Sequence, residues 1–342
     1  MKKIRIAING FGRIGRAFFR VAKDVPELEI VAINDLCDAE NIAYLLKYDS
    51  AYGKSNFDVS VKGKSLITEG KEILSLAQKD PSKLPWKDLD IDIVVESTGA
   101  FTSYEKSKAH LDVGAKRVVV TAPVEDAPPA GISGETVLMG VNDNALETCD
   151  ISSNASCTTN AGSPLLAILD EKIGIEKAML STVHGYTSTQ NLVDGPNRRD
   201  MRRGRAAAEN IVPSTTGAAV ATTKAIPELE GKFDGMALRV PVALGSIVDI
   251  TFVAKKNTSA QEVNKILEDA TGQEKWKGIF TTTKEPIVSS DIVGNTHGAI
   301  ADLSFTRVVD GNLVKVLSWY DNEMGYANTL VKHVIASAKH LQ

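Results

Sequence analysis

Cys157 lies in a segment whose residue types could make its thiol reactive. Residues 153–160 read SNASCTTN, and the apolar run PLLAIL follows at residues 164–169. This pattern predicts a loop that leads into a helix, with the thiol near the positive end of the helix dipole, where a thiolate is favoured. A thiolate is the form of cysteine that attacks carbonyl groups. A free cysteine is more often a small buried apolar residue, so the rest of the chain decides between the two interpretations.

His184 is the candidate proton acceptor for this thiol. It lies in STVHGYT, at residues 181–187, where a strand-like run ends. A histidine in such a position usually has a structural role, but cysteine chemistry on a carbonyl needs a base. An imidazolium beside Cys157 would also stabilise its thiolate. Because the two residues are distant in sequence, their contact is an expectation about the fold.

A glycine-rich segment near the N-terminus predicts a dinucleotide site. Residues 9–15 read NGFGRIG, after the apolar run 4–8 and before a helical pattern. In such a motif the first glycine permits a tight turn, the second lets the backbone approach a pyrophosphate, and the third allows close packing of the helix. A glycine-rich turn without a ligand is the alternative, and the surrounding strand–turn–helix–strand pattern disfavours it.

Asp35 follows the second apolar strand, at residues 30–33, and is placed to bind the ribose of an adenosine. A carboxylate at this position repels a 2′-phosphate, so NAD is favoured over NADP. Later strands end on the same edge of the predicted sheet. The expected cofactor contacts in this half of the chain are Gly10, Phe11, Gly12, Arg13, Ile14, Gly15, Asp35, Thr98, Gly99 and Thr121.

Basic and hydroxyl residues after His184 predict anion sites. Residues 194–205 read DGPNRRDMRRGR, and no aromatic residue interrupts the arginines to stack on bases, so phosphate-bearing small molecules fit better than nucleic acid. A solvated loop that faces another subunit is the alternative. The segment PSTTGAA, at residues 213–219, predicts another helix N-terminus, and Arg239 is a strand arginine among apolar neighbours that needs an anionic partner.

The elements that position these residues predict an α/β protein of two domains. Strands at 4–8, 30–33, 91–95 and 117–120, with a helix at 104–113, predict a doubly wound parallel sheet of the Rossmann type over residues 1–151. Longer alternating strands at 246–253 and 313–319 predict a mixed or antiparallel sheet in an α+β catalytic domain over residues 152–324. The last helix, about residues 325–342, is expected to pack back on the first domain.

Composition excludes several classes of function. The chain has 342 residues, a formal net charge of −4 and three cysteines without a CxxC pair. These features argue against a nucleic-acid or membrane-surface role, a disulfide framework and a metal site. No apolar run is long enough to span a membrane, and the N-terminal apolar stretch is too short for a secretory signal. A cytoplasmic enzyme is the expectation.

These segments together resemble the phosphorylating glyceraldehyde-3-phosphate dehydrogenase family over essentially the whole chain. The matching pieces are INGFGRIGR, SNASCTTN, TVHGYT, VDGP, GRAAAENIVPSTTGAA, GMALRVP and SWYDNEMGY. The resemblance implies a Rossmann domain with a mixed-sheet catalytic domain, NAD as cofactor, and a homotetramer. It also implies a glycolytic or gluconeogenic reaction, in which D-glyceraldehyde 3-phosphate and inorganic phosphate give 1,3-bisphosphoglycerate.

The resemblance implies a role for each matching residue. Cys157 is the implied nucleophile, which forms a hemithioacetal and then a thioester, and His184 is the implied base. Thr187 and Arg239 match the residues that hold the C3 phosphate. The inorganic phosphate site matches Ser156, Thr158, Thr216 and Gly217, and Arg203 matches a phosphate-loop arginine that cannot be ranked firmly against Arg202 and Arg205. Asn322 matches the side chain that fixes the nicotinamide carboxamide, and Pro196 joins Asp35 in the NAD-preferring pattern.

Three positions depart from the family pattern. Ala161 replaces a frequent second cysteine, which rules out a local disulfide with Cys157. Residues 242–245, VALG, replace a frequent TPNV, a change that affects subunit contacts or the edge of the substrate pocket. Thr189 replaces a frequent aspartate. Erythrose-4-phosphate dehydrogenase, which shares the thiol–imidazole chemistry, and a non-catalytic NAD-binding protein are the alternative functions.

Overall fold

The computed structural model describes residues 3–341 of the chain. Two compact units divide these residues. The first comprises residues 3–137, 143–155 and 330–341, and the second comprises residues 138–142 and 156–329. The expected domain boundary after residue 151 remains a prediction. The last helix, α7 (Met324–Ala338), contributes its C-terminal part to the first unit.

The first unit is built on a largely parallel sheet. Its strands, in spatial order, are β10 (Gly134–Thr136), β11 (Ile151–Ser153), β9 (Arg117–Val120), β8 (Ile93–Glu96), β1 (Ile4–Asn9), β2 (Leu28–Asn34), β7 (Lys71–Leu76), β6 (Ser65–Thr68) and β5 (Val59–Lys62). The strands from β10 to β7 pair in parallel, and β6 and β5 continue as an antiparallel meander. β8 and β9 are buried along their whole length, as expected for parallel strands whose faces are covered.

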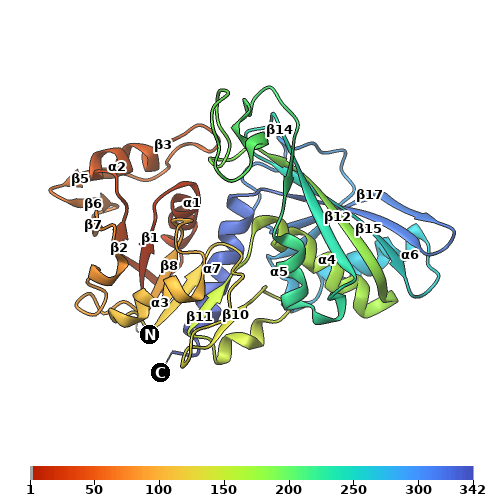
Figure 1. Cartoon of the computed structure of the whole chain (residues 1–342), viewed down its shortest axis with the longest axis horizontal. Helices are drawn as coiled ribbons and strands as arrows, with labels where there is room; N and C mark the ends of the chain where they lie inside the picture. Colours follow the sequence, from red (N-terminus) through yellow and green to blue (C-terminus); the bar gives the residue numbers. More distant parts are fainter. Residues whose placement is uncertain (1–2, 342) are drawn as a thin grey trace. The chain divides into compact units, whose positions relative to one another are not determined.

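The helices and short elements of this unit connect the strands. They are α1 (Arg13–Ala22), α2 (Ala39–Lys47), α3 (Tyr104–Asp112), β3 (Tyr48–Asp49), β4 (Gly53–Lys54) and the 3₁₀ turns η1 (Pro81–Lys83) and η2 (Asp143–Glu147). Two of the helices begin at side-chain caps, because Asp38 accepts from the N–H of Asn41 and Ser103 accepts from the N–H of Lys106. Figure 1 shows α1 beside β1 in the red part of the chain.

The order of strands creates a crevice at the carboxyl end of β1. The chain continues to β2 on one side of β1 and later to β8 on the other side, so the strand order reverses there. In open α/β sheets, ligands bind outside the carboxyl ends of the strands at such a reversal. The segment after β1 carries the glycine-rich motif, so fold and sequence place the predicted dinucleotide site at the same edge.

The second unit is built on a mixed sheet with one covered face. Its strands, in spatial order, are β13 (Val212–Thr215), β14 (Phe233–Val240), β12 (Ile175–Gly185), β15 (Ser246–Ala254), β18 (Leu313–Tyr320), β17 (Ala299–Val309) and β16 (Phe280–Thr283). β12 and β14 pair in parallel, as do β16 and β17, and the other neighbours are antiparallel. Strict alternation of burial along β15 shows that one face of the sheet is packed and the other is open.

Three helices cover the packed face, as Figure 1 shows for the green to cyan part of the chain. These helices are α4 (Cys157–Ile173), α5 (Ala218–Ala225) and α6 (Ala260–Thr271), and the 3₁₀ turns of the unit are η3 (Met201–Gly204), η4 (Pro227–Leu229) and η5 (Glu274–Trp276). α4 begins at Cys157 itself, before the apolar run from which the sequence predicts the helix. Ser156 is its N-cap and accepts from the N–H of Thr159.

The predicted fold class is confirmed, because the chain combines a Rossmann-type parallel sheet with a mixed-sheet unit. The sequence did not predict the meander of β5 to β7, and it indicated only the end of the long strand β12, as the strand-like run at His184. Among residues 3–341, no helix is long and apolar enough to cross a membrane.

Candidate active site and cofactor site

The three motif glycines of the first unit each meet a different constraint. Gly10 has a φ of +91°, and a Cβ there would lie 2.5 Å from the backbone nitrogen of Thr98. A Cβ on Gly15 would lie 2.2 Å from the carbonyl oxygen of Gly10, so a side chain would prevent α1 from packing against the turn. Gly12 is the N-cap of α1 and faces open space. The turn therefore leaves room in front of the helix N-terminus, where a diphosphate fits.

Asp35 is held in place by the turn that it faces. Its Oδ2 accepts from the N–H of Phe11 at 2.7 Å, and its Oδ1 accepts from the N–H of Cys37 at 3.0 Å. A hollow of about 420 Å³ lies beside it, lined at the carboxyl ends of β1, β2 and β8 by residues that include Gly10, Gly12 and Thr98. This volume and lining suit a nucleoside moiety.

The other expected cofactor residues of the first unit contribute in different ways. The Arg13 guanidinium forms an ion pair with Asp49 at 2.7 Å, so its side chain already has a partner within the protein. The ring of Phe11 packs edge-on against Phe19, which leaves its backbone as the part near the turn. Ile14 is in the first turn of α1, Gly99 follows Thr98 with a φ of +70°, and Thr121 follows β9.

A buried polar network that the sequence analysis missed underlies this hollow. The Glu96 carboxylate, at the end of β8, accepts from Asn9 Nδ2 at 2.5 Å, from the N–H and hydroxyl of Thr98, and from His110 Nε2 at 3.1 Å. Trp86 Nε1 donates to His110 Nδ1 at 3.0 Å, and since indole only donates, the His110 proton lies on Nε2. The sequence feature that could have indicated this network is the presence of polar residues, such as Asn9 and Glu96, at the ends of buried strands.

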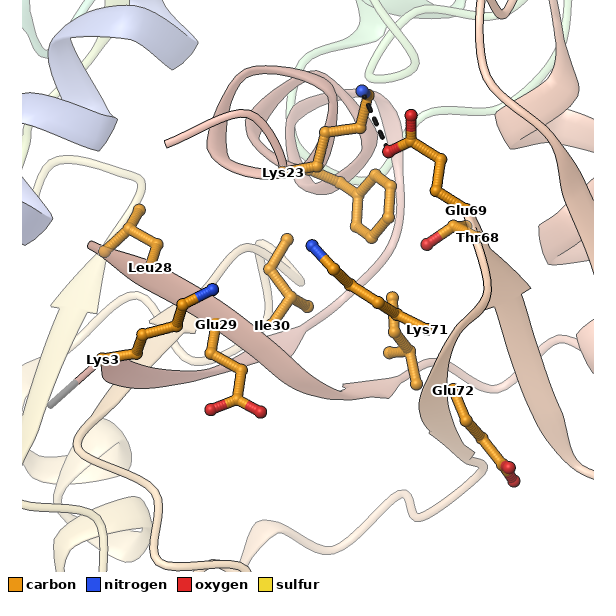
Figure 2. A pocket seen from close by; sticks show the side chains of 11 residues that line it. Lys3, Lys23, Leu28, Glu29, Ile30, Thr68, Glu69, Lys71 and Glu72 are labelled. Carbon is orange, nitrogen blue, oxygen red and sulfur yellow. Dashed lines mark hydrogen bonds and ion pairs between the residues drawn. The ribbon is translucent and has the colours of Figure 1, made fainter. Parts of the chain in front are cut away.

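A second hollow of the first unit, about 470 Å³ in volume, lies at the opposite edge of the sheet. Its lining comes from Lys3 before β1, from the starts of β2 and β7, from the end of β6 and from the C-terminal end of α1, and Figure 2 shows these side chains. Lysine and glutamate side chains of both charges line it, and Lys23 pairs with Glu69 at 3.4 Å. The C-terminal end of α1, at Lys23, borders it instead of a helix N-terminus, and it lies at the amino ends of β1, β2 and β7. It is therefore not the cofactor site.

Cys157 and His184 face each other in the second unit. Cys157 is the first residue of α4, and His184 lies near the end of β12 with 3% of its surface exposed. The distance from Cys157 Sγ to His184 Nε2 is 3.4 Å. The edge of the Tyr320 ring packs against the imidazole, and the Tyr320 hydroxyl lies 2.9 Å from Thr158 Oγ1 and 2.8 Å from Thr182 Oγ1. The expected thiol–imidazole pair is thus present in geometry.

The charge state of this pair differs from the expected thiolate–imidazolium. Burial raises the pKa of the Cys157 thiol, although Arg239 opposes this effect. Burial and the nearby charge of Arg239 lower the pKa of His184 to about 3. Burial thus favours the neutral forms of both groups and opposes the effect of the helix dipole that the sequence analysis considered.

Arg239 lies beside His184 because β12 and β14 are paired in parallel, with these two residues in register. Its Nη1 lies 2.6 Å from His184 Nδ1 and 3.1 Å from the carbonyl oxygen of Gly185. Among residues 3–341, no carboxylate lies within ion-pair distance of this guanidinium. Arg203 lies near enough to lower the pKa of Arg239, and burial lowers it further.

The other residues expected at the anion sites differ in the partners that their side chains contact. Arg203 donates to Ser214 Oγ at 2.8 Å through Nε, whereas Arg202 and Arg205 form ion pairs with Asp200 and Asp194. Of the three arginines that the sequence could not rank, Arg203 is thus the one without a carboxylate partner in the described part of the chain. The hydroxyls of Thr187 and Thr189 lie 2.9 Å apart.

Two helix N-termini of this unit carry the other expected phosphate contacts. The Thr216 hydroxyl accepts from the N–H of Ala218, and Gly217 is the N-cap of α5. The Ser156 hydroxyl caps α4, and the Thr158 hydroxyl bonds to Tyr320. Because its hydroxyl already bonds to Tyr320, Thr158 can bind an anion more directly through its backbone N–H than through its side chain.

Asn322 is fixed by the segment that departs from the family pattern. Its Oδ1 accepts from the N–H of Gly245 at 3.1 Å and from Ser246 Oγ at 3.2 Å, and within the described chain its amide nitrogen has no such partner. This amide suits a carbonyl acceptor such as a carboxamide. Pro196, also in the second unit, is exposed in the loop before η3. Residues 3–341 contain no cluster of three His, Cys, Asp or Glu side chains that could hold a metal ion.

Comparison with known proteins supports the same interpretation of both units. Residues 4–104 match the model of the glyceraldehyde 3-phosphate dehydrogenase NAD binding domain, and residues 156–322 match that of the C-terminal domain. The chain is 47% identical to glyceraldehyde-3-phosphate dehydrogenase of Clostridium acetobutylicum, over 98% of each chain. It is 46% identical to the enzyme of Geobacillus stearothermophilus and to glyceraldehyde-3-phosphate dehydrogenase 1 of Bacillus subtilis, over 96% of each chain.

Proposed function

The chain belongs to the glyceraldehyde-3-phosphate dehydrogenase family, and from this premise we propose that Cys157 and His184 carry out the oxidation of D-glyceraldehyde 3-phosphate. The enzyme is an NAD-dependent oxidoreductase of glycolysis or gluconeogenesis. The single observation that carries the assignment of residues is the 3.4 Å approach of Cys157 Sγ to His184 Nε2 at the N-terminus of α4.

The residues divide the reaction into three steps. Cys157 Sγ adds to the aldehyde carbon, and its proton passes to the carbonyl oxygen to give a hemithioacetal. His184 Nε2 then takes the hydroxyl proton while the carbon loses a hydride, which NAD accepts when bound. The resulting thioester on Cys157 is attacked by inorganic phosphate, which releases 1,3-bisphosphoglycerate and the thiolate.

The chain's polar residues fit the two anions and NAD. Arg239 and Thr187 would hold the C3 phosphate, and the two helix N-termini with Ser156, Thr158, Thr216 and Gly217 would hold inorganic phosphate near Arg203. Gly10, Gly12 and Gly15 leave the space that a diphosphate requires, and Asp35 would accept from the adenosine ribose. Asn322 would orient the carboxamide of the nicotinamide.

Formation of NADH from D-glyceraldehyde 3-phosphate, with and without inorganic phosphate, tests this function. We expect turnover that depends on phosphate. Activity on erythrose 4-phosphate without activity on the triose phosphate would move the chain to erythrose-4-phosphate dehydrogenase, an alternative that the names of the relatives do not favour. NAD binding without activity on either aldehyde would indicate a non-catalytic NAD-binding protein.

We further propose a homotetramer in the cytoplasm, which needs no nucleic-acid or membrane partner. The support comes from the open face of the sheet in the second unit, where Met179, Met236 and Leu313 are exposed. Isolated exposed apolar residues are common, but a group on one face of a sheet suits contact with another copy. Native mass spectrometry measures the number of chains in the assembly.

A further inference from the structure

The hollow at the amino ends of β1, β2 and β7 is a cavity that the proposed function does not use. Its volume of about 470 Å³ falls within the range of small-molecule sites. All of its lining belongs to the first unit, so one packed body forms it. The less exposed part of the lining is an apolar floor, which consists of Phe19, Leu28, Ile30 and Ile73.

Each glutamate around this hollow has a cationic partner. The pairs, with their N–O distances, are Glu29–Arg5 at 3.1 Å, Glu69–Lys23 at 3.4 Å and Glu72–Lys62 at 4.0 Å. Figure 2 shows that the carboxylates of Glu29 and Glu72 point away from the hollow. The negative charges of the lining are therefore already balanced within the protein.

Two lysines of the same lining lack such a partner. Within residues 3–341, neither Lys3 nor Lys71 has a carboxylate at ion-pair distance. Figure 2 shows that both side chains point toward the hollow from opposite sides. Because like charges repel each other, this arrangement is unfavourable without a counter-charge. An anion in the hollow would supply that charge.

Lys23 keeps the nearby end of α1 from repelling an anion. Its Nζ lies 2.6 Å from Asp24 Oδ1 and 4.5 Å from the centre of the Phe57 ring, and its side chain is only 10% exposed. It directly follows α1, so its charge offsets the negative C-terminal end of the helix dipole. Lys3 and Lys71 remain available to a ligand.

We propose that this hollow binds a phosphate monoester with a small apolar body, the phosphate between Lys3 and Lys71 and the body against the apolar floor. A phosphate dianion balances both ammonium groups, whereas one carboxylate would balance only one of them. Thr68, at the end of β6, lines the same hollow and adds a hydroxyl donor. This site is separate from the anion contacts of the second unit, which use arginines and helix N-termini.

Phenyl phosphate is the probe that tests the proposal, because it joins a phosphate that is dianionic at pH 8 to an apolar ring. The enzyme is saturated with NAD, which fills the cofactor site, and carries labelled isoleucine δ1 methyl groups. We expect the methyl NMR signals of Ile30 and Ile73 to shift together during the titration, with one dissociation constant.

The two halves of the probe separate the contribution of charge from that of the apolar floor. Inorganic phosphate has the charge without the ring, and phenol has the ring without the charge. We expect each to bind about tenfold more weakly than phenyl phosphate or worse, since each lacks either apolar burial or a charge-assisted contact. Added salt should weaken the binding of phenyl phosphate, because the lysines are exposed to solvent.

Lys3→Gln and Lys71→Gln each remove one ammonium group from the hollow. We expect each to raise the dissociation constant of phenyl phosphate by about threefold or more, and the double variant by about tenfold or more, as for ion pairs near a surface. Lys64→Gln is the matched control, because Lys64 is an exposed lysine between β5 and β6 that lies outside the lining. It should change the dissociation constant by less than about twofold, since salt screens distant charges.

Three results would each overturn the proposal. They are unmoved Ile30 and Ile73 signals, equal effects of the control and the two lysine variants, and binding of inorganic phosphate as tight as that of phenyl phosphate. The first and third need only the unaltered enzyme, so a misfolded variant does not remove the test. The proposed function fails separately, through absence of NADH formation from D-glyceraldehyde 3-phosphate, a rate that Lys3→Gln and Lys71→Gln should leave unchanged.

Discussion

At the scale of single residues, the chemistry assigned to this chain depends on Cys157 and His184. Replacement Cys157→Ser keeps the shape of the site but supplies an alcohol, which is a much weaker nucleophile than a thiol. We expect NADH formation to fall by about 10³-fold or more, within the range for loss of a nucleophile, while the dissociation constant of NAD changes little. Stopped-flow NADH formation and calorimetric NAD titration measure the two quantities.

Cys149→Ser is the matched control for this prediction. Cys149 is buried, and the charged groups near its thiol are Glu135, Arg117 and Asp150, so it lacks the imidazole that Cys157 faces. Its replacement should leave the rate of NADH formation within about twofold, as for a residue that only packs. Substantial turnover by Cys157→Ser would show that another group is the nucleophile.

Asp35 is expected to determine the preference for NAD over NADP. Its carboxylate is aimed by the N–H groups of Phe11 and Cys37, so it presents a negative charge where a 2′-phosphate would lie. Asp35→Ala should lower NAD affinity by about tenfold, the cost of a hydrogen bond to a charged group, and should raise the ratio of NADP to NAD affinity. Fluorescence titration with each cofactor measures this ratio.

The control for Asp35→Ala is Asp38→Ala, which removes the N-cap of α2 without touching the turn at Gly10. It should lower stability and leave the ratio of cofactor affinities unchanged. If Asp35→Ala also leaves that ratio unchanged, the ribose is not bound by this carboxylate.

Sequence reasoning found these residues because each belongs to a local pattern. Cys157 precedes an apolar helical run, and Gly10 and Asp35 follow apolar strands. The contact of Arg239 with His184 Nδ1 has no such signal, because it depends on the parallel pairing of β12 with β14 across a long stretch of chain. Desolvation of the thiol, which raises its pKa against the expected thiolate, is likewise a property of the packed unit.

At the scale of secondary structure elements, the Glu96 network ties the carboxyl ends of β1 and β8 together beneath the cofactor hollow. Glu96→Gln replaces the carboxylate oxygen that accepts from Asn9 and His110 with an amide NH₂ group. Donors then face donors, and no hydrogen bond forms between them. We expect a loss of about 1–3 kcal/mol of stability, the cost of an unsatisfied buried group. We also expect weaker NAD binding, because Asn9 and Thr98 line the hollow. Chemical unfolding and NAD titration measure these effects.

A second change distinguishes this hydrogen-bond pattern from general damage to the core. Trp86→Phe removes the donor to His110 Nδ1, so the ring can move its proton to that nitrogen and accept at Nε2 from the amide that Glu96→Gln introduces. The double variant should therefore be less destabilised than the sum of the two single variants. Simple additivity would show that the tautomer of His110 does not matter here.

Periodicity predicted six inner strands of the two sheets but not the strands toward their edges. β1, β2, β8 and β9 are apolar runs with clear ends, and β15 and β18 alternate. The meander of β5 to β7 has short, partly exposed strands, whose pattern is weak without the sheet that they join. α4 begins earlier than the apolar pattern because a cap at Ser156, rather than apolar spacing, fixes its start.

At the scale of the whole molecule, each unit holds a buried neutral histidine that makes the folded protein less stable in acid. His333 in the first unit lies between Ser152 Oγ at 2.7 Å and Asn154 Oδ1 at 3.1 Å, and burial lowers its pKa to about 3. His184 in the second unit has a pKa of about 3 for the reasons given above. The unfolded chain protonates both near their ordinary pKa of 6.5.

This difference predicts how stability depends on pH. Between about 3 and 6.5 the unfolded state binds more protons than the folded state, so these histidines stabilise the protein fully above 6.5 and lose this effect as the pH falls below it. Each should contribute a slope of about 1.4 kcal/mol per pH unit within this window. Urea unfolding from pH 8 to pH 5 measures it. His333→Gln should be less stable at pH 8, because it loses packing, but should show a shallower acid slope. An unchanged slope in that variant would mean that His333 is protonated in the folded protein.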